Sequence, residues 1–261
     1  MAATASPLAV DGDASLADYW RFHRAVATAQ LAAWLPLDPQ FLVDISGPHS
    51  RCGAQATRAG HNVLRVNAEP PVTGAPPDPE PVDGLATVTA DPGSLRFLAD
   101  GCADGVIADD RTLSRYIAAE YLVAEIARVL KPGGRLLASV DSLVLGMAIL
   151  AEQHHWAELT DVPSAEVLLI PWPDGTFTRC YGVAHLQDLC TEAGLEAGLV
   201  RPRTVLSPSM VTRMLHRDPK AMARLVRAEL TAEADESVGI QLVVMARKPA
   251  GPPARHDQAR A

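Results

Sequence analysis

Two strands joined by a helix can be recognised in one stretch of the chain, and they constrain its fold more than any other feature. Residues 103–109 (Ala-Asp-Gly-Val-Ile-Ala-Asp) and residues 136–140 (Leu-Leu-Ala-Ser-Val) are short apolar runs. Between them Thr112 or Ser114 can cap a helix, whose apolar face is predicted to carry Ile117, Tyr121, Ala124, Ile126, Val129 and Leu130. Pro132 cannot continue this helix, and Gly133 and Gly134 suit the turn after it. The order predicts a βαβ unit of a parallel sheet, which binds ligands at its carboxyl edge.

Further runs of the same kind extend this unit into a single α/β domain, predicted over residues 15–249. A helix capped by Ser15 is expected to run to about Trp34, and a second helix is expected over residues 50–59. Apolar runs predict further strands at residues 41–45, 62–66, 85–89, 195–203 and 239–249. With 261 residues, of which 48% are hydrophobic, the chain can bury one substantial core. Residues 1–14 and 250–261 are expected to be disordered ends.

Two segments are longer than a minimal fold of this kind needs. Residues 142–182 are expected to form a helix ending near His155, followed by an aromatic and polar run. Residues 204–236 contain two helix starts, Ser207-Pro208 and Asp218-Pro219, each with a capping side chain before a proline. Both segments are predicted to be insertions that cover the carboxyl edge as lids. Residues 70–84 hold six prolines and cannot form a regular helix.

Composition narrows the classes of partner. The net charge of −8 disfavours a nucleic-acid substrate, because no basic stripe is available to neutralise phosphates. The four cysteines include no C-x-x-C pair, so neither a metal site nor a disulfide framework is indicated. No apolar stretch approaches the length of a membrane span. A cytoplasmic protein with a small-molecule substrate is expected, and a homodimer is an open alternative to a monomer.

The wording of the central stretch is more specific than its periodicity. The run Glu125-Ile126-Ala127-Arg128-Val129-Leu130-Lys131-Pro132-Gly133-Gly134 after the strand at 104–109 resembles the class I S-adenosylmethionine (SAM)-dependent methyltransferases, of the type 11-like kind. This resemblance covers about residues 41–203 and the last strand. It implies a Rossmann-like, doubly wound sheet of seven mostly parallel strands with an antiparallel last strand. It also implies SAM as cofactor and in-line methyl transfer to a small-molecule acceptor.

The glycine-rich turn that follows the first strand in that family is altered in this sequence. The family pattern D/E-h-G-x-G-x-G aligns with Asp44-Ile45-Ser46-Gly47-Pro48-His49-Ser50, so that Ser46, Pro48 and Ser50 replace its three glycines. A single glycine, Gly47, stands one position away. The resemblance implies that Asp44, Ser46 and Gly47 bind the cofactor, although Pro48 offers no amide hydrogen.

Other positions match the cofactor pattern better. By resemblance the ribose hydroxyls would be bound at the end of the second strand, by Asn67 or by Glu69, and both alternatives stay open. Asp91, together with Ser94, matches the position that binds adenine, and an ordinary Asp-Pro-Gly turn is an equally good interpretation of Asp91. Asp109, followed by Asp110 and Arg111, would line the methyl-donor end of the pocket.

The acceptor side is less defined. If the acceptor must lose a proton, His154 and His155 are the predicted catalytic bases, because the segment after the fifth strand commonly faces the acceptor in this family; His185 is a weaker candidate. Trp172, Arg179 and Tyr181 are predicted to bind substrate. Tyr19 and His23 on the first helix are predicted to close the pocket, and an amphipathic helix docked on the core would explain the same residues.

Three functions remain in view. The leading hypothesis is a SAM-dependent methyltransferase. The second is a catalytically inactive protein of the same fold that binds a ligand or joins a complex. The third is a nicotinamide-dependent oxidoreductase, but Ser46-Gly47-Pro48-His49-Ser50-Arg51 does not provide the room for a pyrophosphate that a G-x-G-x-x-G turn gives.

Overall fold

The computed structural model describes residues 14–48, 50–68, 82–232 and 239–250. His49, Glu69 and most of the proline-rich segment lie outside these ranges, as do nearly all residues of the two ends for which disorder is predicted. Within them no helix is long and apolar enough to cross a membrane.

Within the described residues the central sheet has nine strands, two more than the seven predicted. β3 (Leu85–Thr89), β2 (Asn62–Asn67), β1 (Phe41–Asp44), β4 (Ala103–Ala108) and β5 (Leu130–Ser142) are neighbours and run parallel. β9 (Gln241–Arg247) pairs antiparallel with β5, and β8 (Glu196–Pro202) pairs antiparallel with β9. The mostly parallel, doubly wound sheet with an antiparallel last strand is therefore confirmed. Its strand order reverses between β1 and β4, which is where doubly wound sheets bind ligands.

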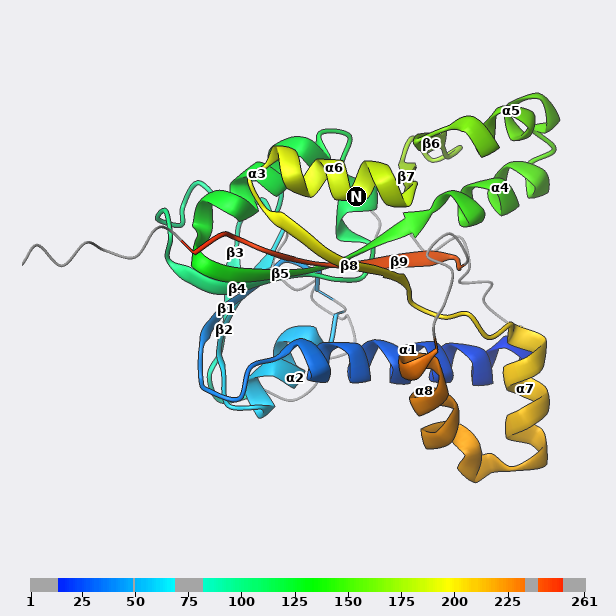
Figure 1. The fold of residues 1–261 in the computed structure, drawn as a ribbon, viewed down its shortest axis with the longest axis horizontal. Helices are drawn as coiled ribbons and strands as arrows, with labels where there is room; N and C mark the ends of the chain where they lie inside the picture. Colours follow the sequence, from blue (N-terminus) through cyan, green and yellow to red (C-terminus); the bar gives the residue numbers. More distant parts are fainter. Residues whose placement is uncertain (1–13, 49, 69–81, 233–238, 251–261) are drawn as a thin grey trace, which may run out of the picture.

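Helices cover both faces of this sheet (Figure 1). α3 (Ala119–Val129) and α6 (Val183–Glu192) lie on one face, and α1 (Ala14–Trp34) and α2 (Cys52–Arg58) lie on the other. Alternate residues of the strands separate the two cores: Val43 and Val106 join the α3 side, whereas Leu42 and Ile107 join the α1 side. Burial on both faces explains why these strands read as apolar runs rather than as alternating patterns.

The central βαβ unit differs in detail from its prediction. Residues 112–115 form a 3₁₀ turn rather than the start of the helix, and α3 begins only at Ala119. The buried face of α3 consequently includes Leu122, Val123, Ile126 and Val129, whereas the predicted Ile117 and Tyr121 are 66% and 41% exposed. Ala124 is also exposed. Gly133 has the expected positive φ of 80°, and β5 already begins at Leu130.

The first insertion contains more than helices. α4 (Leu143–Glu152), capped by Ser142, leads to α5 (Trp156–Asp161) and a 3₁₀ turn at Val162–Ser164. The segment expected to be an aromatic and polar run then forms a hairpin of β6 (Val167–Pro171) and β7 (Phe177–Tyr181). β7 continues the sheet through pairs with Asp141 and Ser142 at the end of β5.

The second insertion packs against the N-terminal helix. α7 (Pro208–Arg217) is capped by Ser207, as predicted, and Asp218 caps a 3₁₀ turn at Pro219–Ala221 that leads into α8 (Met222–Thr231). Val211, Leu215 and Leu225 are buried against Tyr19, Phe22 and Val26 of α1. The two insertions lie on opposite sides of the sheet, both toward the carboxyl end of β5 (Figure 1).

We expect Phe22→Ala to lower the free energy of unfolding by about 3–5 kcal/mol, because its fully buried ring fills the core between α1 and the second insertion. Leu37→Ala is the control, since Leu37 is fully exposed, and it should change the free energy by less than about 0.5 kcal/mol. Urea unfolding followed by circular dichroism measures both values. Equal values for the two variants would contradict this packing.

Candidate functional site

The loop after β1 contains the first predicted cofactor residue, Asp44, whose carboxylate is fully buried. The carboxylate accepts hydrogen bonds from the amides of Ser46 at 3.0 Å and Gly53 at 2.8 Å. Its Oδ2 atom also lies 3.6 Å from Nε of Arg65, a buried arginine on β2. Burial raises the pKa of Asp44, and these partners oppose the rise. The carboxylate thus binds the backbone at the beginning of α2. The missing side chain of Gly53 leaves room for this contact, because a Cβ there would stand only 2.7 Å from Oδ2.

Ser46 and Gly47 form the turn that replaces the glycine-rich motif. The buried hydroxyl of Ser46 accepts a hydrogen bond from the amide of Asp109 at 3.0 Å, which ties the β1 loop to the end of β4. Gly47 has a φ of +100°, which glycine adopts at little cost. The guanidinium of Arg115 covers this turn: Nη2 donates to the carbonyl of Ser46 at 3.2 Å and would lie 3.6 Å from a Cβ on Gly47.

Asp109 anchors a buried polar network beneath α1. Its Oδ1 lies 2.7 Å from Nη2 of Arg203, a buried residue that follows β8, and the thiol of Cys52 is 3.4 Å from its Oδ2. Burial alone would raise the pKa of Asp109, but the charge of Arg203 and the hydrogen bonds from Ser139 and Arg203 together lower it. Nε of Arg203 donates to the Gln30 side chain of α1 at 3.1 Å. This ion pair therefore links β4, β8 and α1.

The two residues after Asp109 have an uncommon backbone conformation. Asp110 and Arg111 have φ values of 55° and 62°, in the left-handed region that non-glycine residues seldom occupy. Arg111 is held there because its amide donates to Ser139 Oγ at 3.1 Å and its Nε donates to Asp141 at 2.7 Å. Burial raises the pKa of Asp141 to about 6, even against the opposing charge of Arg111. Such strain persists only where surrounding contacts impose it, and it is common at functional sites.

Asn67, at the carboxyl end of β2, is buried and incompletely satisfied. The residue is 2% exposed, and its Oδ1 atom has no hydrogen-bond partner within the described ranges. A buried acceptor without a partner is costly, so an external donor at this position would be favoured. The competing ribose candidate, Glu69, lies outside the described residues.

Asp91 forms the turn that was its alternative interpretation. Its Oδ1 accepts the amide of Gly93 at 2.8 Å, while the residue itself is exposed. Ser94 is partly buried beside it. The ring of Tyr116 lies so close to Gly93 that a Cβ there would stand 2.6 Å from Cε1. Residues from two loops, after β3 and after β4, therefore meet at this turn.

The residues predicted for the acceptor lie elsewhere and are mostly occupied by internal partners. Arg179 pairs with Glu120 at 2.5 Å, and the buried Tyr181 donates to the carbonyl of Leu113 at 3.2 Å. Trp172 is partly buried in the β6–β7 hairpin and donates to Thr178. His154 and His155 are both exposed between α4 and α5, where His155 lies 3.4 Å from Glu158. Among the described parts of the chain, no hydrogen bond or ion pair joins these residues to the β1 loop.

Tyr19 and His23 face the sheet rather than open solvent. Tyr19 shares a hydrogen bond of 2.9 Å with Thr204, and Nε2 of His23 lies 3.2 Å from Oε1 of Gln241. Burial, reinforced by the charge of Arg203, lowers the pKa of His23 to about 4. His23 is therefore neutral at physiological pH, next to the Asp109–Arg203 ion pair.

Sequence reasoning missed four charged residues that shape this edge: Arg65, Arg115, Asp141 and Arg203. A signal existed for Arg65, because an arginine inside the apolar strand Val63-Leu64-Arg65-Val66 must find a buried partner. Arg115 gave no comparable signal. No group of residues suited to hold a metal ion occurs in the part of the chain that the structure describes.

We expect the wild-type protein to lose stability relative to His23→Gln as the pH falls from 7 to 4. The unfolded imidazole takes up a proton near pH 6.5, whereas the folded one stays neutral to about pH 4, so the unfolded state gains protons first. The difference should approach about 3 kcal/mol over this range. Urea unfolding of both proteins across the range measures it, and parallel pH curves would contradict the assignment.

The sequence matches no protein-family model and no curated protein. Solved structures do match the fold. One is the 1,6-didemethyltoxoflavin-N1-methyltransferase of Burkholderia thailandensis, bound to 1,6-didemethyltoxoflavin and S-adenosylhomocysteine (SAH). It is 20% identical with a TM-score of 0.55, over 89% of this chain and 81% of that one.

Two further matches show the breadth of this fold. A SAM-dependent methyltransferase of Mesorhizobium loti is 18% identical with a TM-score of 0.55, over 87% of this chain and all of that one (100%). The [4+2]-cyclase SpnF is 18% identical with a TM-score of 0.52, over 88% of this chain and 81% of that one. Likeness at these identities concerns the fold, and the chain has the Rossmann-like fold of class I SAM-dependent methyltransferases.

Proposed function

We propose that this protein is a SAM-dependent methyltransferase that acts on a small-molecule acceptor by in-line methyl transfer. The observation that carries the proposal is Asn67, a buried side chain whose Oδ1 lacks a partner within the described residues, at the carboxyl end of β2. It ends β2, the strand beside β1, close to the point where the strand order reverses. A ribose hydroxyl would supply the missing donor. This supports Asn67 over Glu69 as the ribose contact.

The residues around Asn67 suit the other parts of the same ligand. The Asp91 turn with Ser94 and the ring of Tyr116 offers a carboxylate and an aromatic surface for adenine. The methionine end of SAM carries both a carboxylate and an ammonium group. Arg115 and Asp110, whose charged groups lie 4.0 Å apart beside Gly47, offer the complementary pair of charges. These two residues would take over the role of the lost glycine amides.

When bound, SAM would supply an electrophilic methyl group. The chain's part in such a reaction is mainly to align donor and acceptor, which is the largest requirement of an in-line displacement. The β1 loop is fixed by Ser46 and Arg115, and the Asp109–Arg203 ion pair fixes the end of β4. His154 or His155 as a base, a homodimer and a cytoplasmic location stay predictions.

We expect wild-type protein to bind SAH saturably in isothermal titration calorimetry and Asn67→Ala to weaken this binding by about tenfold, a loss of about 1.4 kcal/mol. Asn62→Ala is the matched control, because Asn62 is exposed at the opposite end of the same strand. Thermal unfolding of both variants checks that they fold. Absence of saturable SAH and SAM binding to the wild type would reject the methyltransferase and leave a fold that serves another ligand or reaction.

The charge pair beside Gly47 predicts a selective effect. Arg115→Gln should weaken SAH binding about tenfold or more but leave binding of 5′-methylthioadenosine within twofold, because the latter ligand lacks the amino-acid end. Asp110→Asn should show the same selectivity. Arg227→Gln, at an exposed arginine of α8, is the control and should change neither affinity. Equal losses for both ligands would contradict this role of Arg115.

A further inference from the structure

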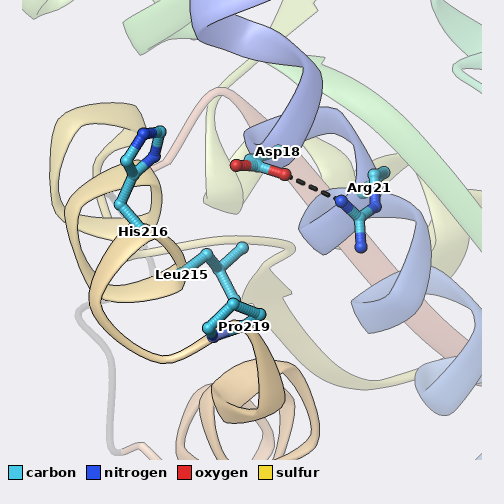
Figure 2. A pocket seen from close by; sticks show the side chains of 5 residues that line it. All are labelled: Asp18, Arg21, Leu215, His216 and Pro219. Atoms are coloured by element: carbon cyan, nitrogen blue, oxygen red, sulfur yellow. Dashed lines mark hydrogen bonds and ion pairs between the residues drawn. The ribbon is translucent and has the colours of Figure 1, made fainter.

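Two cavities lie where the N-terminal helix meets the second insertion, and their lining includes none of the residues proposed to bind SAM. The smaller, of about 310 Å³, lies between α1 and the end of α7 and is lined by Asp18, Arg21, Leu215, His216 and Pro219 (Figure 2). The larger, of about 790 Å³, is lined by Leu16, Pro208, Ser209, Thr212, Arg213, His216 and Arg217. His216 lines both. Volumes of this size are typical of sites for small organic ligands.

The larger cavity is cationic although the chain as a whole carries a net charge of −8. Arg213 and Arg217 both line it, one helical turn apart on α7, and no carboxylate of a described residue does. Among the described residues, neither guanidinium makes a hydrogen bond or an ion pair. Like charges at this spacing repel each other, so an anion placed between them would be bound by both.

The wall that carries these arginines is held in place by packing. Val211 and Leu215 on the opposite face of α7 are buried against α1, with 0% and 5% of their surfaces exposed. This packing fixes the α7 backbone that carries Arg213 and Arg217, whose side chains are exposed. The hydroxyls of Ser209 and Thr212 add polar groups to the lining, and Leu16 and Pro208 add apolar surface.

The smaller cavity has a different electrostatic character. Arg21 donates to Asp18 at 2.9 Å, so the two charges on α1 compensate each other there (Figure 2). A ligand's anionic group is therefore favoured in the larger cavity, near Arg213 and Arg217 of α7. His216 is the lining residue that the two cavities share.

We propose that the larger cavity is a binding site for a small organic phosphate, held by Arg213 and Arg217. A phosphate dianion matches two guanidinium groups better than a carboxylate does, because it presents more acceptor oxygens and more charge. The apolar part of the ligand would lie against Leu16 and Pro208. This site is separate from the residues proposed to bind SAM and does not depend on that function.

Phenyl phosphate is a suitable probe, with benzoate and inorganic phosphate for comparison, in isothermal titration calorimetry on the full chain. The wild type should bind phenyl phosphate saturably and more tightly than benzoate or inorganic phosphate. The double variant Arg213→Gln/Arg217→Gln should weaken this binding at least tenfold.

The control is Lys220→Gln/Arg227→Gln, which removes the same charge from exposed residues outside both cavities and should change the affinity less than twofold. Circular dichroism and thermal unfolding verify that both variants fold. The proposal is overturned by absence of saturable binding to the wild type, by equal losses in the two double variants, or by benzoate binding as tightly as phenyl phosphate.

Discussion

A buried carboxylate destabilises a fold by several kcal/mol unless an opposite charge accompanies it, and three such groups lie at the carboxyl edge of this sheet. Asp44, Asp109 and Asp141 each face an arginine, respectively Arg65, Arg203 and Arg111. In every pair the two residues come from different elements. Neutralising the three carboxylates therefore depends on the register of β1 on β2, on the position of β8 and on the backbone conformation after β4. The edge where a ligand would bind thus also holds these buried ion pairs, on which the fold depends.

Elements that depend on local pattern were predictable from the sequence. β3 was placed at Leu85–Thr89 and α1 ended at Trp34 as expected, and the cap at Ser207 was recognised from its neighbouring proline. The hairpin β6–β7 was not predicted, because its polar and aromatic residues become a strand pair only beside the end of β5. The exposed side of α3 was misjudged because a 3₁₀ turn delays the start of the helix and so rotates its apolar face.

The candidate site shows the same division. The sequence located Asp44, Asn67 and Asp109 at strand ends, since strand order brings those ends together. It did not reveal that Asp44 is satisfied by Gly53 and Arg65, or that Arg115 covers Gly47, because these contacts depend on how the elements pack and not on a local sequence pattern. Fold alone does not decide the reaction, as a cyclase with this architecture illustrates. The Oδ1 atom of Asn67, which has no partner among the described residues, is therefore more informative than the overall likeness.

The tied loop after β1 has a consequence for how a ligand is captured. Glycine-rich turns have high conformational entropy, and ordering them on binding reduces affinity. In this chain the hydroxyl of Ser46, the carboxylate of Asp44 and the guanidinium of Arg115 already order the turn. A ligand would then bind to a preformed loop rather than induce the loop to close. In this loop, contacts that preorganise the backbone stand in place of the glycines of the family pattern.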